Sequence, residues 1–247
     1  KIGNEYLVAA TLRPENVFGQ TNLWVNPRAK HVIVEVEGEN WILSEEAAEK
    51  LKYQKDDVLF KREVDIKQYI GKKVLAPGAN RNVMVLPALF CNPDIGTGIV
   101  TSVPSHAPYD WIALKDLKMN KAECEEYGLN NEEIRRIEPI ALIKLEGWDT
   151  HPAQQICQRM NIKSQNEMDR LEEAKKEIYK EEYHKGIMLE ISGKYAGKKV
   201  EDAKELVKAE LMEQGLADIF HDLSEEVICR CGNKVVIQRI DDQWFIR

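Results

Sequence analysis

The sequence has few cysteines, and they are not arranged to crosslink a fold. The five cysteines are scattered and odd in number, which argues against a disulfide framework and favours a reducing compartment. Cys229 and Cys231 could supply half of a zinc site, but a structural zinc site needs four ligands and no second pair lies nearby. We therefore predict structural thiols and no metal site.

Long apolar runs are also missing. No stretch is long enough to span a bilayer, and residues 1–10 lack the charged start and apolar run of a signal peptide. The chain has no initiator methionine, and it stops inside an apolar stretch. From these features we expect no contact with a membrane, and we expect the sequence to be a piece of a larger protein.

An excess of positive charge is missing as well. The chain has 35 Lys and Arg against 42 Asp and Glu, so its net charge is −7. A stand-alone nucleic-acid binder is usually basic, because its cations displace counterions from the phosphates. If this chain binds RNA, most of the affinity must come from elsewhere.

Several familiar catalytic motifs are absent. The sequence contains neither the Gly-x-Ser-x-Gly motif of serine hydrolases nor a glycine-rich phosphate loop. The five histidines have no metal-ligand spacing with carboxylates or cysteines. These absences argue against an acyl-transfer triad, a phosphate loop and a histidine metal centre.

The first part of the chain is rich in short strands. Residues 31–37 alternate apolar and polar side chains, and Ser44 then precedes a short helix as its N-cap. Further strands are expected at 5–12, 58–66, 72–76, 81–86 and 99–103. Frequent Gly and Pro between short strands indicate a small barrel or sandwich.

The second part is mainly helical. A helix should start at Pro108, and helices are expected at 166–185, with Asn166 as its cap, and at 200–214, ending at Gly215. We interpret their charge runs as solvated faces. Strands at 140–143, 226–230 and 234–240 return to the strand-rich body, so we predict one domain, 1–247, with a helical insertion at 148–220.

Two segments could carry chemistry. In the first, a strand ends at Thr11 and Pro14 forces an extended turn, which exposes a hydroxyl beside the guanidinium of Arg13. In the second, Gly96-Thr97-Gly98 lets a ligand approach the backbone, and His106 and Asp110 flank a helix start. Alone, each segment is explained as well by ordinary turn and helix-start chemistry.

Together, in this order and at this separation, the two segments resemble the editing domain of the leucyl-, valyl- and isoleucyl-tRNA synthetases. The details favour the archaeal and eukaryotic cytosolic leucyl type: Thr11-Leu12-Arg13-Pro14-Glu15, the stretch from Phe18 to Val25, Ser105 to Asp110, a branch-specific stretch from Ile137 to Lys199, and the ending Asp242-Gln243-Trp244-Phe245. The resemblance implies an α+β fold, with a β-barrel surrounded by helices and a mainly helical insertion.

The resemblance also implies roles for single residues. Asp110 matches an invariant acid that holds the α-ammonium of the misattached amino acid. Thr11 and Arg13 match the peptide that positions the water and the terminal adenosine. The expected substrate-binding residues are Leu12, Asn16, Thr97, Thr101, Val103 and His106. Asn16 departs from a usual Thr that helps keep leucine out, so leucine rejection is expected to work differently here.

The implied activity is the hydrolysis of mischarged tRNA(Leu) that carries isoleucine, norvaline or methionine. The domain should need no cofactor, although the full-length enzyme would use ATP and Mg. Expected partners are the tRNA 3′ end and the rest of the synthetase, in the cytoplasm. Two alternatives stay open: a valyl or isoleucyl editing domain, and a non-catalytic module that docks tRNA or protein.

Overall fold

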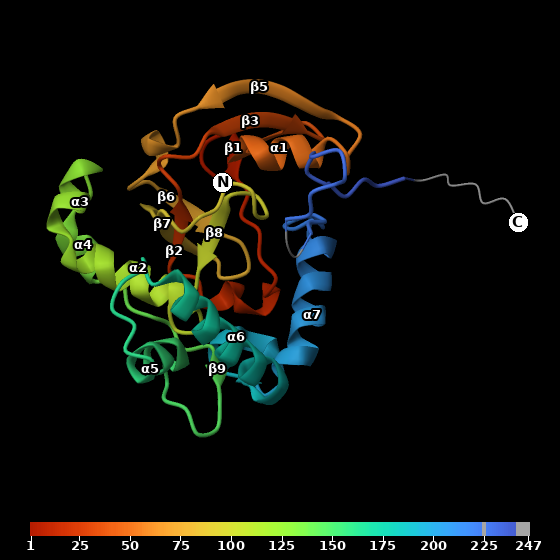
Figure 1. Ribbon diagram of the computed structural model, residues 1–247. Helices are drawn as coiled ribbons and strands as arrows, with labels where there is room; N and C mark the ends of the chain where they lie inside the picture. Colours follow the sequence, from red (N-terminus) through yellow and green to blue (C-terminus); the bar gives the residue numbers. More distant parts are fainter. Residues whose placement is uncertain (224–225, 241–247) are drawn as a thin grey trace, which may run out of the picture.

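A computed structural model describes residues 1–223 and 226–240 (Figure 1). The strands are β1 (Glu5–Leu7), β2 (Asn22–Val25), β3 (His31–Val36), β4 (Glu39–Ser44), β5 (Val58–Val64), β6 (Lys73–Ala76), β7 (Arg81–Pro87), β8 (Ile99–Ser102), β9 (Ile143–Lys144) and β10 (Ile187–Met188). The helices are α1 (Glu45–Leu51), α2 (Pro108–Met119), α3 (Lys121–Glu126), α4 (Asn131–Arg135), α5 (Pro152–Arg159), α6 (Met168–Lys185) and α7 (Val200–Glu213). Three short 3-10 helices are η1 (Pro14–Gly19), η2 (Ile66–Tyr69) and η3 (Glu190–Tyr195). The fold is therefore α+β.

The first sheet has the strand order β1-β4-β3-β5. The alternation along β3 is as predicted, and Val32, Val34 and Val36 pack with α1. Between them, Ile33 points to the other face and joins the main core. The Ser44 hydroxyl accepts a hydrogen bond from the Ala47 amide at 3.1 Å, which confirms the predicted helix cap.

The second sheet has the order β6-β7-β2-β8, and the main core lies between the two sheets. The first strand segment joins the sheets along one side. Leu7 pairs with Ile42 in β4, and Ala10 forms a bridge with Val100 in β8. This segment was predicted as one continuous strand, but its hydrogen bonding changes from one sheet to the other within three residues.

A closed β-barrel, which the resemblance implied, is not shown. On the side opposite the 5–10 segment, β5 and β6 are the edges of their sheets and are not paired with each other. The side chains from Leu59 to Glu63 in β5 are exposed. Closure needs hydrogen bonds along every edge, so the two four-stranded sheets are open, and β9 and β10 form a separate two-stranded antiparallel sheet.

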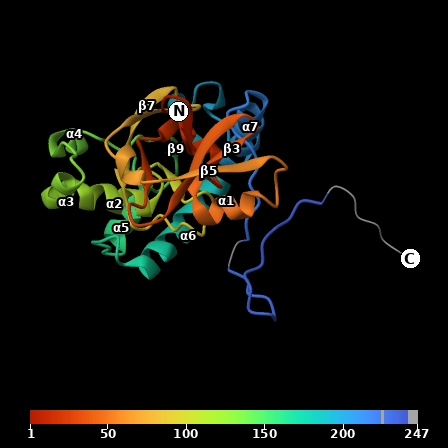
Figure 2. The same cartoon turned by 90° about the horizontal axis from the view of Figure 1, so that it is seen from above.

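Helices cover the lower part of the second sheet in the view of Figure 1. α2, α5 and α6 share an apolar cluster that includes Ile112, Ile156 and Leu171. In both views α3 and α4 lie at the end of the molecule opposite α7 (Figure 2). The helices predicted at 166–185 and 200–214 are confirmed as α6 and α7. No helix in the described ranges is long and apolar enough to cross a membrane.

One end of α6 differs from the prediction. Glu167, not Asn166, occupies the cap position, and its side chain makes no capping hydrogen bond. Met168, the first residue of the helix, is exposed. The cap was inferred from residue type alone, whereas the chain enters the helix one residue later, where Glu167 accepts hydrogen bonds from the Lys163 and Ser164 amides.

The two strands predicted at 226–230 and 234–240 are wrong. Residues 226–240 contain only an isolated bridge between Ile228 and Lys234. Their apolar side chains are exposed, because no sheet lies beside them to complete a core. The ending at residues 242–245, which contributed to the resemblance, lies outside the described residues.

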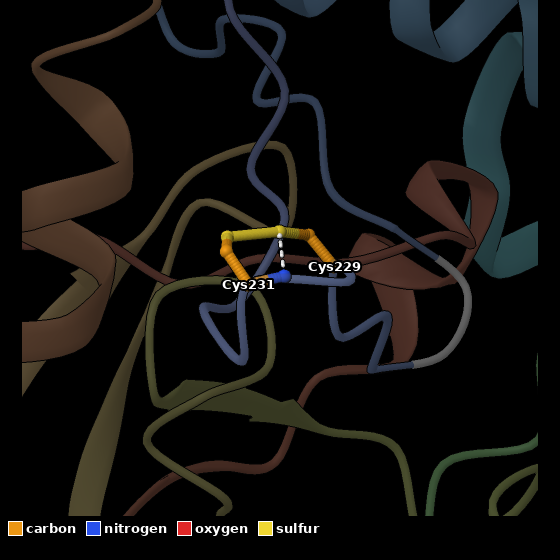
Figure 3. The surroundings of a disulfide bond; sticks show 2 residues. All are labelled: Cys229 and Cys231. Carbon is orange, nitrogen blue, oxygen red and sulfur yellow. Dashed lines mark hydrogen bonds between the residues drawn. A yellow bond between two sulfur atoms is a disulfide. The ribbon is translucent and has the colours of Figure 1, made fainter.

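The turn between these two segments contains a disulfide. Figure 3 shows Cys229 and Cys231 joined through their sulfurs, and the Cys231 amide donates a hydrogen bond to the Cys229 sulfur at 3.1 Å. The prediction of free thiols is therefore wrong for this pair, although it holds for Cys91, Cys124 and Cys157. With a single residue between the two cysteines, the bond fixes a local turn and crosslinks no distant elements.

Candidate active site

The two segments singled out in the sequence lie side by side. The Ala10 amide donates a hydrogen bond to the Ile99 carbonyl at 3.3 Å. Gly96 has φ +56°, and a Cβ atom built on it would lie 2.7 Å from the Ala10 Cβ. A side chain at position 96 would therefore meet both backbone strain and a steric clash. Glycine allows the two segments to approach each other.

The first segment turns sharply after β1. Pro14 opens the 3-10 helix η1, and the Asn16 amide donates to the Arg13 carbonyl at 3.0 Å. The Thr11 hydroxyl accepts a hydrogen bond from the Arg13 amide at 3.0 Å. Thr11 is exposed and Leu12 is 87% exposed, so the turn presents a hydroxyl and an apolar side chain to solvent.

Arg13 turns in the opposite direction, into the protein. Its Nε lies 2.9 Å from Glu15 Oε1, its Nη1 lies 2.7 Å from Glu182 Oε2, and the guanidinium stacks over the Tyr179 ring at 4.5 Å. Burial would lower the pKa of Arg13, but the two carboxylates outweigh it and raise the pKa. The guanidinium is thus an internal cation that fixes the shape of the turn.

Asp110 lies in the first turn of α2, where Pro108 starts the helix. Its Oδ2 accepts from the Val103 amide at 2.7 Å and its Oδ1 accepts from the indole Nε1 of Trp24 at 3.1 Å. The residue is only 3% exposed. Burial raises the pKa of Asp110 to about 7, although both hydrogen bonds lower it. A cation that binds next to this carboxyl would favour its ionised form.

His106 is fully buried and fastens the second segment to two other elements. Its Nε2 accepts a hydrogen bond from the Leu142 amide at 2.9 Å. The ring proton must therefore reside on Nδ1, which donates to Glu182 Oε1 at 2.6 Å. With both nitrogens engaged inside the protein, the imidazole holds the backbone in place and has no free atom for proton transfer.

Of the remaining predicted residues, Thr97 and Thr101 lie beside or in β8, and Asn16 lies in η1. The Thr97 hydroxyl is buried and donates to the Ile99 carbonyl at 3.3 Å. Thr101 is half-buried and pairs with Leu23 across the sheet. Asn16 is 3% exposed, and neither the oxygen nor the nitrogen of its side-chain amide has a hydrogen-bond partner among the described residues.

The structure therefore brings together two groups of predicted site residues. Val103 contacts both His106 and Asp110, and Arg13 contacts both Thr11 and Asn16. Within the described part of the chain, no hydrogen bond or ion pair joins Thr11 or Arg13 to Asp110 directly. The two groups are linked through the hydrogen bond between Ala10, next to Thr11, and Ile99 in β8.

No family model matches the chain. Among curated proteins it is 47% identical to the leucine-tRNA ligase of Archaeoglobus fulgidus and 46% identical to that of Pyrococcus abyssi. These matches cover 99% and 100% of this chain but 26% of each ligase. The chain thus spans about a quarter of the length of these relatives.

The solved structures are similar over most of their own length. The crystal structure of GlLeuRS-CP1 matches with a TM-score of 0.79 and 30% identity, over 90% of this chain and 86% of that one. This chain belongs to the CP1 editing domains of the leucyl-tRNA synthetases. The editing domain of the Plasmodium knowlesi cytosolic leucyl-tRNA synthetase has a TM-score of 0.77 at 23% identity, over 85% of this chain and 81% of that one, and shares the fold.

Three residues of this CP1 editing domain contact the predicted site but were missed in the sequence. They are Trp24, which contacts Asp110, and Tyr179 and Glu182, which contact Arg13. Glu182 was detectable in principle. The buried face of α6 runs through Leu171, Ala174, Ile178 and Glu182 at spacings of three and four, so the acid continues an apolar stripe. The interpretation of this charge run as fully solvated is wrong at position 182.

Two surface concavities of the CP1 editing domain lie elsewhere. One of ≈ 550 Å³ is lined by Trp148, His151 and neighbouring polar residues, and one of ≈ 480 Å³ is lined mainly by α2, α3 and residues 164–166. Neither is lined by a predicted site residue. The first is tied to the second segment, because the Ser105 hydroxyl lies 3.0 Å from His151 Nδ1.

Proposed function

We propose that this chain hydrolyses the ester of mischarged tRNA(Leu) and releases isoleucine, norvaline or methionine. The observation that carries the proposal is the buried carboxyl of Asp110, held by Trp24 and by the Val103 amide directly after β8, the strand that is hydrogen-bonded to Ala10, next to Thr11. An acid held in this way can recognise a cationic amino group, and the neighbouring turn can hold the ester and a water.

The chemical need for such a site is clear. Amino acids that differ from leucine by shape or by one methylene are separated by only about 1–3 kcal/mol in a hydrophobic pocket. A synthetase with one such pocket attaches wrong amino acids, and a second pocket has to remove them. The aminoacyl ester is already activated, so this second pocket has mainly to position its reactants.

Asp110 is proposed to bind the α-ammonium of the misattached amino acid. Its two oxygens each accept one hydrogen bond from the protein and can accept another. Because its pKa is raised to about 7, the free carboxyl is close to its point of half-ionisation at neutral pH. The arriving ammonium stabilises the carboxylate and forms a charge-assisted hydrogen bond with it.

Thr11 is proposed to orient the attacking water and the terminal adenosine. Its oxygen already accepts from the Arg13 amide, so its own proton stays available to a ligand. Arg13 serves the same function indirectly, because its side chain is held by carboxylates and its backbone contacts Thr11 and Asn16. The terminal hydroxyl of the tRNA assists in activating the water, so a substrate without it should react slowly.

The substrate-binding residues are proposed to complete the pocket. Leu12, which is exposed, contacts the terminal adenosine, and Thr97, Thr101, Val103 and His106 shape the side of β8 and the following turn. Asn16 is proposed to keep leucine out by the bulk of its polar side chain, without the methyl group of the Thr that is usual at this position. No cofactor is needed for this step, whereas the whole ligase would use ATP and Mg. With a net charge of −7, the chain should depend on the rest of the synthetase for tRNA affinity.

The test is deacylation of isoleucyl-tRNA(Leu) and leucyl-tRNA(Leu) by the wild-type chain and by Asp110→Ala. We expect selective release of isoleucine that is lost in the variant. If neither ester is cleaved, the comparison is repeated in the full-length synthetase. Absence of hydrolysis there as well would refute the catalytic proposal and leave a module that docks tRNA or protein.

The same assay separates the other candidate. A valyl or isoleucyl editing domain would cleave threonyl-tRNA(Val) or valyl-tRNA(Ile) in preference to isoleucyl-tRNA(Leu). The identities of 46% and 47% to leucine-tRNA ligases favour the leucyl substrate.

A further inference from the structure

One carboxylate connects the two segments of the site from outside both of them. Glu182 Oε2 lies 2.7 Å from Arg13 Nη1 in the first segment, and Glu182 Oε1 lies 2.6 Å from His106 Nδ1 in the second. Glu182 is located near the end of α6, in the helical part of the chain, and it is completely buried.

A carboxylate in this environment is expensive to bury unless its oxygens are paired. Here Oε1 accepts a hydrogen bond from His106, and Oε2 forms an ion pair with Arg13 without hydrogen-bond geometry. The two partners belong to different segments of the site. Burial alone would raise the pKa of Glu182, but His106 and Arg13 lower it below its ordinary value. Glu182 therefore acts on the site as a fixed negative charge.

We propose that Glu182 is a positioning residue for the hydrolysis, which sets the distance between the turn at Thr11 and the carboxyl of Asp110. This inference rests on the proposed function. Through Arg13, Glu182 fixes the backbone that holds the Thr11 hydroxyl and Asn16. Through His106, it fixes the turn that leads from Val103 into α2 and Asp110.

The other contacts of Arg13 do not replace this connection. Glu15 lies in the same segment as Arg13, so its ion pair shapes the turn but does not tie it to the second segment. Tyr179 lies on α6, one turn before Glu182, and supports the guanidinium from its face. Among the described residues, Glu182 is the group that contacts both Arg13 and His106.

The chemical consequence is a requirement of geometry. The ammonium at Asp110 and the water at Thr11 have to be held at the two ends of one small ester, and a displacement of about 1 Å in such a site can cost roughly 100-fold in rate. Loss of the connection should lower kcat more than it raises KM, since the ammonium contact itself remains. It should also weaken the rejection of leucine, because Asn16 moves with the Arg13 turn.

The test compares Glu182→Gln with Glu181→Gln, in this chain and in full-length synthetase that carries it. Glutamine at position 182 still accepts from His106 but no longer pairs with the Arg13 charge. Glu181 is its neighbour on α6, where it forms an ion pair with Lys185 at 2.7 Å. We expect Glu182→Gln to reduce kcat on isoleucyl-tRNA(Leu) roughly 10- to 100-fold, and Glu181→Gln to leave it unchanged.

A double-mutant cycle separates positioning from simple stabilisation. If Glu182 acts through Arg13, then Glu182→Gln should cost little further activity in an Arg13→Met background. Melting temperatures are measured for every variant, and rates are taken well below the lowest of them. Additive losses in the cycle, or a lower melting temperature with unchanged kcat and unchanged leucine rejection, would overturn the proposal.

One further measurement keeps the failure of this inference distinct from the failure of the proposed function. If the wild-type enzyme does not deacylate, the proposed function fails and the variants are uninformative about rate. If the wild-type enzyme is inactive, or if Glu182→Gln does not fold, NMR of the wild-type chain still tests whether Glu182 connects Arg13 and His106. The Arg13 Nη1–H and His106 Nδ1–H signals, which belong to the two groups paired with Glu182, should be protected from solvent exchange. Exchange of either as fast as in a free side chain would refute the buried connection.

Discussion

The indole nitrogen of Trp24 donates a hydrogen bond to Asp110 Oδ1 at 3.1 Å, across 86 positions of sequence. Trp24 lies in β2 and is fully buried, so the second sheet directly supports the first turn of α2. Because the indole can only donate, it stabilises the ionised form of the carboxyl. This relationship makes the protonation of Asp110 depend on a residue outside both site segments.

Trp24→Phe should therefore move the pH dependence of editing. If ionised Asp110 holds the ammonium as proposed, kcat/KM should rise with pH around the Asp110 pKa of about 7. Removal of the indole donor raises that pKa further, and a hydrogen bond to a charged group is worth about 1.5–3 kcal/mol, or roughly one to two pKa units. The rising limb of the kcat/KM profile should shift to higher pH by this one to two pH units. Trp41→Phe, which loses a bond to the exposed Glu39, is the control.

Asp110 should also make stability depend on pH. Its folded-state pKa is raised from 3.8 to about 7, so the folded protein binds its proton more tightly than the unfolded chain does. The resulting stability is present below pH 3.8 and is lost as the pH rises through about 7. At about 1.4 kcal/mol per pKa unit, the loss amounts to a few kcal/mol.

The measurement is the free energy of unfolding of the wild type minus that of Asp110→Asn, from pH 4 to 8. Other groups titrate in both proteins and cancel in the difference. We expect the difference to fall steadily as the pH rises. A flat difference would show that Asp110 has an ordinary pKa in the folded protein.

Gly96→Ala should destabilise the protein and separate the two segments. Gly3 and Gly96 have nearly the same φ, +55° and +56°, but a Cβ at Gly3 meets nothing within 4 Å, whereas one at Gly96 lies 2.7 Å from the Ala10 Cβ. Gly3→Ala should cost about 1–2 kcal/mol for the backbone alone. Gly96→Ala should cost clearly more, and it should lower the deacylation rate. Equal melting temperatures for the two variants would contradict the close approach.

Asn16→Ala should allow leucine into the pocket. The side-chain amide of Asn16 is buried without a hydrogen-bond partner among the described residues. Its removal should therefore change the free energy of unfolding little, while the smaller alanine leaves space for a larger substrate side chain. Leucyl-tRNA(Leu) hydrolysis should rise roughly 10-fold or more. Asn16→Thr, of similar bulk, should keep leucine out. Unchanged leucine release in Asn16→Ala would place the barrier elsewhere.

Local signals in the sequence were sufficient for many elements. The alternation in β3, the Ser44 cap of α1 and Pro108 at the start of α2 depend on neighbouring residues alone, and all three are confirmed. The closed barrel and the late strands depend on whether distant edges meet. The exposed β5 and the isolated Ile228–Lys234 bridge show that they do not.

The site also has residues that the sequence could suggest and residues that only tertiary packing reveals. The resemblance suggested Thr11 and Asp110, whose roles stay predictions, and the structure shows that their segments are adjacent. The resemblance gave no hint of Glu182, because the partners of this acid are defined by tertiary packing, with His106 lying 76 positions away. An acid in an apolar helical stripe is a clue that some partner exists, but the stripe does not identify which one.

The location of Glu182 on α6 has a consequence for protein engineering. A chimera that exchanged the helical segment 148–220 between two synthetases would also exchange the acid that holds Arg13 and His106. Editing would then survive only when the donor segment carried an equivalent acid at the same helical position. The helical segment and the two site segments would therefore have to be transferred together, because Glu182 contacts both of them.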